Sequence, residues 1–351
     1  MGDGASEKRL TFIRKNYTSF GGAERYLERV CNRLEKEGVK YEIIHSHIPK
    51  WLPSWLKTLL FSIQVCSDKC DRFYFSLDRI SCPDIYRAGD GVHRAYLQTR
   101  RFSLNPLHPA LLYLEKRCFE NAKLIIANSK MVKEQIVRHY HINPDKIKVV
   151  YNGIPIKMPI ADAKLRLSEE FGFDIKNRVI LFVGSGFERK GVKELLLILS
   201  QLKHNFTAFV VGKDKSMAKY TKLTKKLGIG DKVIFTGPRK DVDLFYSASD
   251  LFILPSHYDP FSNVILEAMN FGNVVFTTRD NGASEILSDK FIMSCPTDFL
   301  IISIINRFLT DDDLLRRQKR TNSQIAKNYS IEKNVAETLK CINIVIQAGL
   351  L

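Results

Sequence analysis

Short apolar runs alternate with longer amphipathic stretches along most of the chain. Runs at 10–13 and 41–44 flank a stretch at 22–37 whose apolar residues recur at helical spacing. Apolar runs of this length are typical of buried strands. Further strands are predicted at 72–75, 123–127 and 146–151, with amphipathic helices between them. Strands that alternate with helices predict a parallel sheet.

A turn-rich stretch at 151–173 interrupts both patterns, since it contains Asn152-Gly153 and Met158-Pro159. A second βα series follows, with strands predicted at 179–183, 206–211, 232–235, 250–254 and 273–276. Helices are expected to begin near Gly191, Met217, Asp241 and Ser262. We therefore predict an α/β protein of two Rossmann-like, doubly wound parallel-sheet domains, over residues 1–155 and 156–330. Residues 311–328 and 331–346 are predicted helices, and the sequence leaves open which domain the segment 331–351 packs on.

The excess of basic over acidic residues indicates which kinds of molecule the protein binds. The chain has 351 residues, of which 45% are hydrophobic, and a formal net charge of +16. This excess favours anionic partners, which include nucleic acid, an anionic membrane and phosphorylated small molecules. The basic residues form no known nucleic-acid-binding motif, so we expect no nucleic acid partner.

Segments that would direct the chain out of the cytoplasm are not found in the sequence. It has neither an apolar run of about 18 residues nor the apolar stretch of a signal peptide. We therefore expect a cytoplasmic protein. Its seven cysteines are scattered and form no Cys-x-x-Cys pair, so we expect them to be reduced and buried.

Candidate chemistry lies where predicted strands lead into helices. In open α/β sheets these junctions bind ligands, because helix N-termini offer free N–H groups to anions. The first junction holds Gly21-Gly22, which allows close approach to a phosphate but equally fits a tight turn. The pair matches neither the dinucleotide fingerprint nor the P-loop, which argues against a simple dehydrogenase or ATPase.

Two junctions of the second series carry stronger signals. The segment 183–191 places Arg189 and Lys190 near a helix start, where basic residues are electrostatically unfavourable unless an anion shares the site. The other junction holds Asp259 and Glu267, on either side of a predicted helix start at Ser262. Carboxylate oxygens only accept hydrogen bonds and therefore suit sugar hydroxyls. Together these residues would bind a molecule with hydroxyl groups at both ends and a diphosphate between them.

The segment from Asp259 to Glu267, with the segments 184–191 and 20–24 before it, resembles retaining glycosyltransferases of the GT-B fold. The resemblance is to family 4, nearest to the lipopolysaccharide-core glucosyltransferases, and it covers nearly the whole chain. It implies a hexosyltransferase that uses a nucleotide-diphosphate sugar, with a UDP-sugar as the expected donor and no metal or other cofactor. It also implies a glycan or lipid-linked acceptor, in lipopolysaccharide-core or other envelope polysaccharide synthesis.

The resemblance also implies roles for individual residues. Arg189 and Lys190 would grip the diphosphate, Glu267 the ribose and Asp259 the transferred sugar, although most relatives have Glu where this chain has Asp259. The implied donor-binding residues are Gly21, Gly22, Gly186, Arg189, Lys190, Gly212, Lys213, Arg239, Asp259, Phe261, Ser262, Asn263, Val264 and Glu267.

On the acceptor side, the resemblance points to Asp90, with His93 as the reserve candidate and Arg94 beside them. Asp90-Gly91 also fits an ordinary turn. We expect this turn to face a cleft between the domains. The implied catalytic residues are thus Asp90, Arg189, Lys190 and Asp259.

Other readings of the sequence remain open. The acidic groups at 241–243 and 311–313 could suggest a metal site, but both lie at predicted helix starts, where acidic residues complement the helix dipole. The segment 48–61 combines Trp51 and Trp55 with leucines and lysines, which suits either an anionic membrane surface or a helix packed on its own sheet. Alternatives for the whole chain are a nucleotide-sugar epimerase, a nucleic-acid-binding protein and an inactive membrane-bound scaffold.

Overall fold

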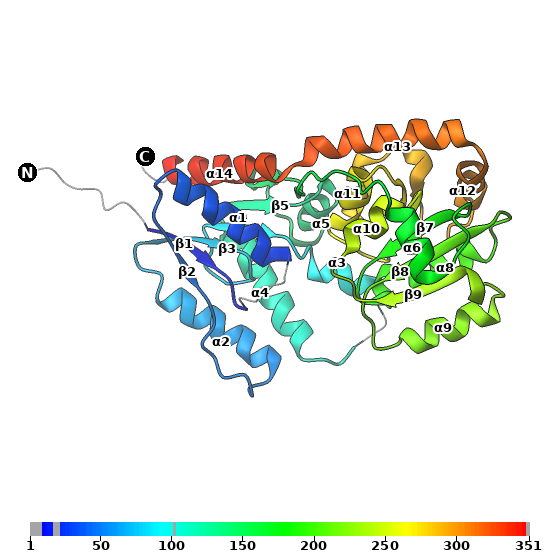
Figure 1. Ribbon diagram of the computed structural model, residues 1–351. Helices are drawn as coiled ribbons and strands as arrows, with labels where there is room; N and C mark the ends of the chain where they lie inside the picture. The colour runs from blue at the N-terminus through cyan, green and yellow to red at the C-terminus, as the bar shows by residue number, and fades with distance from the viewer. Residues whose placement is uncertain (1–8, 17–21, 101–102, 349–351) are drawn as a thin grey trace, which may run out of the picture. The chain divides into compact units, whose positions relative to one another are not determined.

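The computed structural model describes residues 9–16, 22–100 and 103–348. The chain divides into two compact units (Figure 1). Unit 1 comprises Met1–Tyr151 and Ile331–Leu351, and unit 2 comprises Asn152–Ser330. The C-terminal helix α14 (Ile331–Ala348) therefore belongs to the first unit, which answers a question that the sequence left open.

Unit 1 contains a six-stranded parallel sheet in the order β2-β1-β3-β4-β5-β6. Its strands are β1 (Arg9–Ile13), β2 (Tyr41–Ile44), β3 (Arg72–Ser76), β4 (Ile85–Ala88), β5 (Leu124–Ala127) and β6 (Ile147–Val149). Its helices, besides α14, are α1 (Gly22–Lys36), α2 (Ser54–Ser67), α3 (His93–Gln98), α4 (Leu107–Asn121), α5 (Lys130–Tyr140) and the short η1 (Pro144–Lys146).

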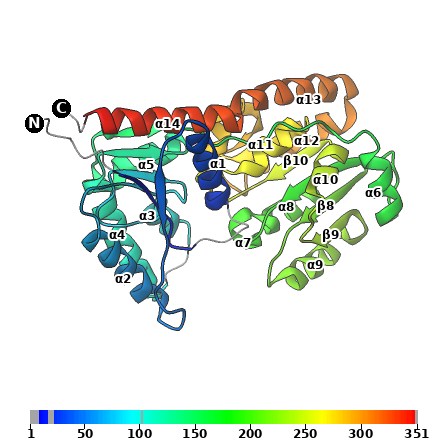
Figure 2. The ribbon, with the colours of Figure 1, turned by 60° about the vertical axis from the view of Figure 1, so that its left-hand side comes forward.

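Different helices cover the two faces of this sheet. Side chains alternate between the faces along a strand, so Phe12 and Ile13 of β1 point in opposite directions. Phe12 packs in a cluster with residues of α1 and α14, which lie side by side in Figures 1 and 2. Ile13 and Tyr74 pack on the other face with Phe61 of α2. The first unit is thus a sheet between two layers of helices.

Strand β4 is not among the predicted strands. It reads Ile-Tyr-Arg-Ala, and a charged residue in a four-residue run hides the strand signal. Arg87 is nevertheless buried, and its guanidinium carbon lies 3.8 Å from the centre of the Tyr26 ring. The aromatic face compensates part of the cost of burying the charge.

The expectation that all cysteines are reduced and buried is wrong. Cys66, near the end of α2, and Cys82, in the loop before β4, form a disulfide, and Cys70 and Cys295 are exposed. A separation of 16 residues does not reveal that two cysteines meet, because the pairing depends on how α2 returns to the sheet.

Unit 2 contains a second six-stranded parallel sheet, in the order β12-β11-β10-β7-β8-β9. Its strands are β7 (Arg178–Val183), β8 (Phe206–Val211), β9 (Val233–Gly237), β10 (Leu251–Leu254), β11 (Val274–Thr278) and β12 (Ile292–Met293). Its α-helices are α6 (Ala163–Phe171), α7 (Phe187–Lys190), α8 (Val192–Leu199), α9 (Met217–Lys226), α10 (Val242–Ala248), α11 (Asn263–Asn270), α12 (Ile301–Thr310) and α13 (Asp312–Ala326). Short helices η2 (Gly230–Lys232), η3 (Gly282–Ile286), η4 (Asp289–Phe291) and η5 (Lys327–Tyr329) complete it.

Aromatic side chains fill both faces of this second sheet. Phe209 of β8 packs against Phe171 of α6 and Phe245 of α10, with ring centres 5.2 and 5.3 Å apart. Phe182 of β7 points to the opposite face and packs against Phe187 of α7. The predicted fold class, two doubly wound parallel-sheet units, is confirmed.

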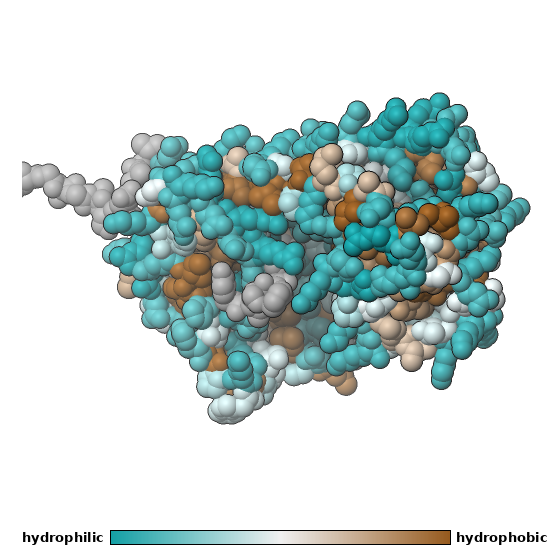
Figure 3. Space-filling model, in the orientation of Figure 1, coloured by the Kyte–Doolittle hydropathy of each residue, from teal (hydrophilic) through white to brown (hydrophobic). Residues whose placement is uncertain are grey.

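The visible surface is mostly hydrophilic, and hydrophobic residues form separate spots on it (Figure 3). Among the described residues, no helix combines the length and the apolar character that crossing a lipid bilayer requires.

Candidate functional site

The strongest candidate site lies where the strand order of unit 2 reverses. Strand β7 has β8 on one side and β10 on the other, so the chain moves in opposite directions from this point. Ligands of open α/β sheets bind at such switch points, at the carboxyl ends of the strands. Arg189 and Lys190 lie in the short helix α7 after β7, and Asp259 lies in the loop after β10.

These three side chains form one hydrogen-bonded cluster. Oδ2 of Asp259 accepts hydrogen bonds from Nζ of Lys190 at 2.6 Å and from a terminal nitrogen of Arg189 at 3.0 Å. Nζ of Lys190 also donates to the hydroxyl of Ser262 at 2.8 Å, and Arg189 donates to the carbonyl of Tyr258 at 3.0 Å. Two cations thus converge on a single carboxylate oxygen.

Burial differs sharply within this cluster. Asp259 and Lys190 are 6% and 8% exposed, whereas the side chain of Arg189 is 38% exposed. Burial alone would raise the pKa of Asp259, but the charges of Lys190 and Arg189 outweigh it and hold the pKa below its usual range. Asp259 is therefore a carboxylate, and Arg189 presents the accessible positive charge.

Asn281 organises the loop that leads into α11, and sequence reasoning assigned no role to it. Its side chain is fully buried, and Oδ1 accepts from the backbone N–H groups of Ser262 (3.3 Å) and Ala283 (3.1 Å). Ser262 precedes α11 as predicted, but its hydroxyl does not cap the helix, since it accepts from Lys190. Asn281 lies in the loop between β11, which ends at Thr278, and η3, and this position after a strand was the available signal for it.

Glu267 lies one turn into α11 and is half-buried. Its Oε2 accepts a hydrogen bond from the hydroxyl of Tyr246 at 2.9 Å, and the Tyr246 ring stacks on Phe271 with centres 5.6 Å apart. Burial and the neighbouring Glu267 raise the pKa of Tyr246, so the phenol stays a donor. Tyr246, which sequence reasoning missed, therefore fixes this carboxylate.

Other predicted donor-binding residues surround the same loops. Gly186 adopts a left-handed conformation with open space beside it. A Cβ on Gly212 would lie 1.9 Å from the carbonyl oxygen of Gly184, so this position requires glycine. Lys213 is exposed, whereas Phe261 is buried and Val264 half-buried.

Three further residues were predicted to bind the donor, namely Asn263, Gly22 and Gly21. Asn263 begins α11 and accepts a hydrogen bond from Asn152 at 2.8 Å. Gly22 begins α1 in unit 1, with open space beside it. Gly21 lies outside the described residues.

Arg239 has a different environment from the one expected of a donor ligand. Its guanidinium donates to Asp241 at 2.7 and 2.8 Å and to Glu170 at 2.8 and 3.2 Å. These carboxylates hold the guanidinium in place, and the donor-binding role of Arg239 stays a prediction.

The acidic groups weighed as metal ligands are also engaged. Asp243 pairs with Lys157 at 2.5 Å, Asp312 with Arg178, and Asp313 with Arg316 at 2.6 Å. Asp311 caps α13 by accepting from the Leu314 N–H at 2.8 Å. Within the described ranges, no three His, Cys, Asp or Glu residues group together as metal ligands.

The acceptor-side candidates follow β4 in unit 1. Asp90 is exposed in a turn closed by a hydrogen bond from the Gly91 N–H to the Ala88 carbonyl at 3.1 Å. His93 begins α3, and its Nε2 lies 3.1 Å from Nδ1 of His108. Burial and the charge of Arg79 lower the pKa of His93 to about 4, so the imidazole is neutral at pH 7. Arg94 is exposed over the ring of Tyr140.

A charged cluster that sequence reasoning missed lies at the switch point of unit 1, between β1 and β3. Arg14 follows β1 and pairs with Asp78 (3.4 Å), which follows β3, and with Glu24 of α1 (3.0 Å). Burial, together with the nearby charge of Asp90, raises the pKa of Asp78 despite Arg14. Asp90 therefore lies near this cluster, and the positions of Arg14 and Asp78 shortly after two strands were the signal for the cluster.

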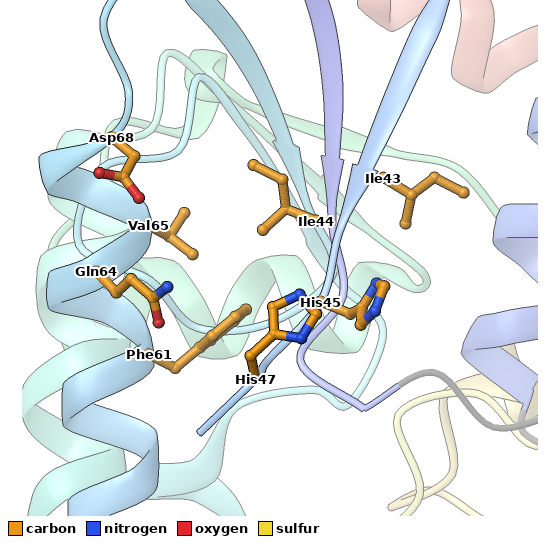
Figure 4. A pocket seen from close by; sticks show the side chains of 8 residues that line it. All are labelled: Ile43, Ile44, His45, His47, Phe61, Gln64, Val65 and Asp68. Carbon is orange, nitrogen blue, oxygen red and sulfur yellow. The ribbon is translucent and has the colours of Figure 1, made fainter. Parts of the chain in front are cut away.

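A pocket of about 150 Å³ lies elsewhere in unit 1, between edge strand β2 and α2 (Figure 4). Its lining includes His45 and His47, whose ring centres are 4.8 Å apart, and Phe61 and Asp68 of the α2 side. The pocket contains none of the predicted site residues, and we assign no chemistry to it.

Two protein-family models match parts of the chain. The model described as "Glycosyl transferases group 1" matches residues 164–325, which include the Arg189–Asp259 cluster and Glu267. The model "Glycosyltransferase Family 4" matches residues 79–157, which include Asp90 and His93.

Proteins similar in sequence to this chain include glycosyltransferases. The chain is 28% identical over 220 residues to the lipopolysaccharide glucosyltransferase WaaG of Escherichia coli, a match that covers 59% of this chain and 58% of WaaG. The chain spans about half the length of the curated relatives it matches.

Solved structures show the same fold over nearly the whole chain. The crystal structure of WaaG superposes with a TM-score of 0.79 at 21% identity, covering 94% of this chain and 98% of WaaG. The structure of Anabaena Alr3699/HepE in complex with UDP and glucose has a TM-score of 0.72 at 20% identity and covers 96% and 99% of the two chains.

Proposed function

Because the chain is a family 4 glycosyltransferase of the GT-B fold, we propose that it transfers a hexose from a nucleotide-diphosphate sugar to a hydroxyl of a glycan or glycolipid. The observation that carries the proposal is the convergence of Arg189 and Lys190 at the switch point of unit 2. The similarity to WaaG favours an acceptor in lipopolysaccharide core or a related envelope polysaccharide.

Arg189 and Lys190 supply the charge that the reaction requires. Cleavage of the donor leaves a nucleoside diphosphate, and fixed cations stabilise the charge that develops on it. The exposed Arg189 fork suits bidentate binding of phosphate oxygens, while Lys190 adds a point charge. Asp259 holds both cations in place before the donor binds.

The two carboxylates have separate tasks in this proposal. Glu267, fixed by Tyr246, accepts hydrogen bonds from the ribose hydroxyls. Asp259 uses its second oxygen for a hydroxyl of the transferred sugar. UDP-sugars are the expected donors, and HepE, a structural relative, has been solved with UDP and glucose.

We propose that transfer is metal-independent and retains the anomeric configuration. The two cations provide the charge that a divalent ion would otherwise supply. The acceptor oxygen bonds to the anomeric carbon on the face from which the diphosphate departs, and a phosphate oxygen takes the acceptor proton. Asp90 orients the acceptor and no protein nucleophile is needed.

A donor panel tests this function without knowledge of the acceptor. UDP-, GDP-, ADP- and CMP-sugars are incubated with the full chain, and released nucleotide and thermal stabilisation are measured. We expect a UDP-sugar to raise the melting temperature and to be hydrolysed slowly, with no loss of rate in EDTA. Stabilisation by no member of the panel contradicts the proposal.

The same panel distinguishes the alternatives. A new nucleotide sugar that forms from the donor alone indicates an epimerase. Salt-dependent binding to DNA or RNA, without nucleotide release, favours a nucleic-acid-binding protein.

Helix α2 and the segment before it favour peripheral contact of a cytoplasmic enzyme with the anionic inner face of the membrane. Trp51 is 80% and Ile63 65% exposed, and Leu60 is also exposed. Residues 48–67 include Lys50 and Lys57 but no acidic residue. Exposed aromatic and aliphatic side chains beside lysines suit the interface of an anionic bilayer.

Vesicle binding tests this contact. On vesicles with about one quarter phosphatidylglycerol in phosphatidylcholine, Trp51→Ala/Ile63→Ser is expected to lower the partition coefficient about 10- to 100-fold, since each side chain loses its burial in lipid. Leu300→Ser in unit 2 is the matched control, because Leu300 is 84% exposed on another surface. Equal binding by both variants contradicts the assignment of α2 to the membrane.

A further inference from the structure

Glu115 of α4 is a carboxylate with no exposed surface in unit 1. Its oxygens accept hydrogen bonds from Nε of Arg79 at 2.9 Å and from the hydroxyl of Tyr140 at 2.6 Å. They also accept from the backbone N–H groups of His93 at 2.6 Å and Arg94 at 3.2 Å. Glu115 thereby satisfies the first N–H groups of α3, since Val92 at the N-cap position offers no side-chain cap.

Arg79 connects this carboxylate to the turn that carries Asp90. Its side chain is 10% exposed, and a terminal nitrogen donates to the carbonyl of Gly91 at 2.9 Å. The residue directly after Asp90 is therefore held by Arg79, and His93 by Glu115. One buried ion pair fixes both ends of the segment 91–93.

Burying an ion pair costs free energy, which suggests that the Glu115–Arg79 pair does more than stabilise the fold. Desolvation of two charges often exceeds their mutual attraction, and apolar residues of similar volume frequently replace such pairs without loss of stability. A buried pair that bonds two backbone sites of one turn restricts the conformation of that turn. The groups that this ion pair bonds belong to the turn of Asp90 and to the start of α3, which carry the acceptor-side candidates Asp90 and His93.

We propose that Glu115, acting with Arg79, is a positioning residue that fixes Asp90 and His93 for the acceptor. The proposal rests on the proposed transferase function and assigns no substrate contact to Glu115. It predicts that loss of the carboxylate charge affects use of the acceptor more than cleavage of the donor.

The first measurement is hydrogen exchange at the backbone amides of His93 and Arg94 in the full chain. Glu115→Gln is expected to accelerate exchange there at least about tenfold, because the amides lose a charged acceptor. Glu120→Gln is the matched control, since Glu120 lies on the same helix with 37% of its side chain exposed. Unchanged exchange in Glu115→Gln overturns the proposal.

The second measurement separates positioning from a general loss of structure. The best donor of the panel is used with truncated lipopolysaccharide as acceptor. In Glu115→Gln the acceptor KM is expected to rise about tenfold or more, while nucleotide release without acceptor changes less than about twofold. Equal losses in both reactions overturn the positioning role.

Arg79→Lys serves if Glu115→Gln does not fold. It keeps the positive charge but loses the planar fork that reaches Gly91, and the same selective rise in acceptor KM is expected. A wild-type chain that neither binds nor cleaves any donor overturns the transferase function, whereas the exchange rates still decide whether Glu115 fixes the turn.

Discussion

Lys190→Ala is expected to lower the rate of nucleotide release and of sugar transfer by about 100- to 1,000-fold. The ammonium group of Lys190 lies 2.6 Å from Asp259 and 2.8 Å from the hydroxyl of Ser262, in a nearly buried position. A preorganised charge in such a site stabilises the departing diphosphate more than an exposed charge does. Steady-state release of nucleotide from the best donor measures the effect.

Lys193→Ala is the matched control for this prediction. Lys193 is an exposed lysine in the first turn of α8, three residues further along the chain. Its loss is expected to leave the rate within about twofold, as surface substitutions generally do. If Lys190→Ala keeps more than a tenth of the wild-type rate while remaining folded, the role given to Lys190 is wrong.

The amino-acid sequence was sufficient to predict most of the sheet architecture. The strand predicted at 206–211 has these bounds, and the strand predicted at 179–183 is extended by one residue at Arg178. Both are continuous apolar runs, which is the pattern of a strand buried on two faces. The two-residue strand β12 and the Arg-containing β4 carry no such run and were not predicted.

Site residues were predictable where a local motif existed. Arg189, Lys190 and Asp259 were all candidates, but their mutual ion pairing joins positions 70 residues apart and depends on the adjacency of β7 and β10. Tyr246 and Glu115 were missed because each acts through a contact between distant segments. Arg14 and Asp78 were missed although each follows a strand.

Both units place charged residues at the point where the strand order reverses. In unit 2 this point combines two cations and one carboxylate, which suits a diphosphate. In unit 1 it combines Arg14 with Asp78 and Glu24, with Asp90 nearby, so acidic groups predominate. Carboxylates repel phosphate and accept hydrogen bonds from hydroxyls, which favours the assignment of the donor to unit 2 and of the acceptor to unit 1.

Gly191 lies where the two segments of the proposed donor site approach each other, and its substitution is expected to have the largest effect on stability. It has a φ of +76°, and a Cβ there would lie 1.8 Å from the carbonyl oxygen of Pro255, directly after β10. Because the obstacle is backbone, the loop after β7 or the loop after β10 has to move. A contact that brings these loops together also sets the distance between Lys190 and Asp259.

Gly191→Ala is therefore expected to destabilise the protein by more than about 3 kcal/mol, which for a domain of this size lowers the melting temperature by at least about 6 °C. Gly186→Ala provides the comparison, since Gly186 has a similar φ of +73° but open space around the added methyl group. That variant pays only the left-handed backbone strain, about 1–2 kcal/mol. The difference between the two melting temperatures isolates the clash with Pro255. Equal shifts would mean that the loops after β7 and β10 do not approach each other as described, and the geometry of the Lys190–Asp259 pair would then have to be revised as well.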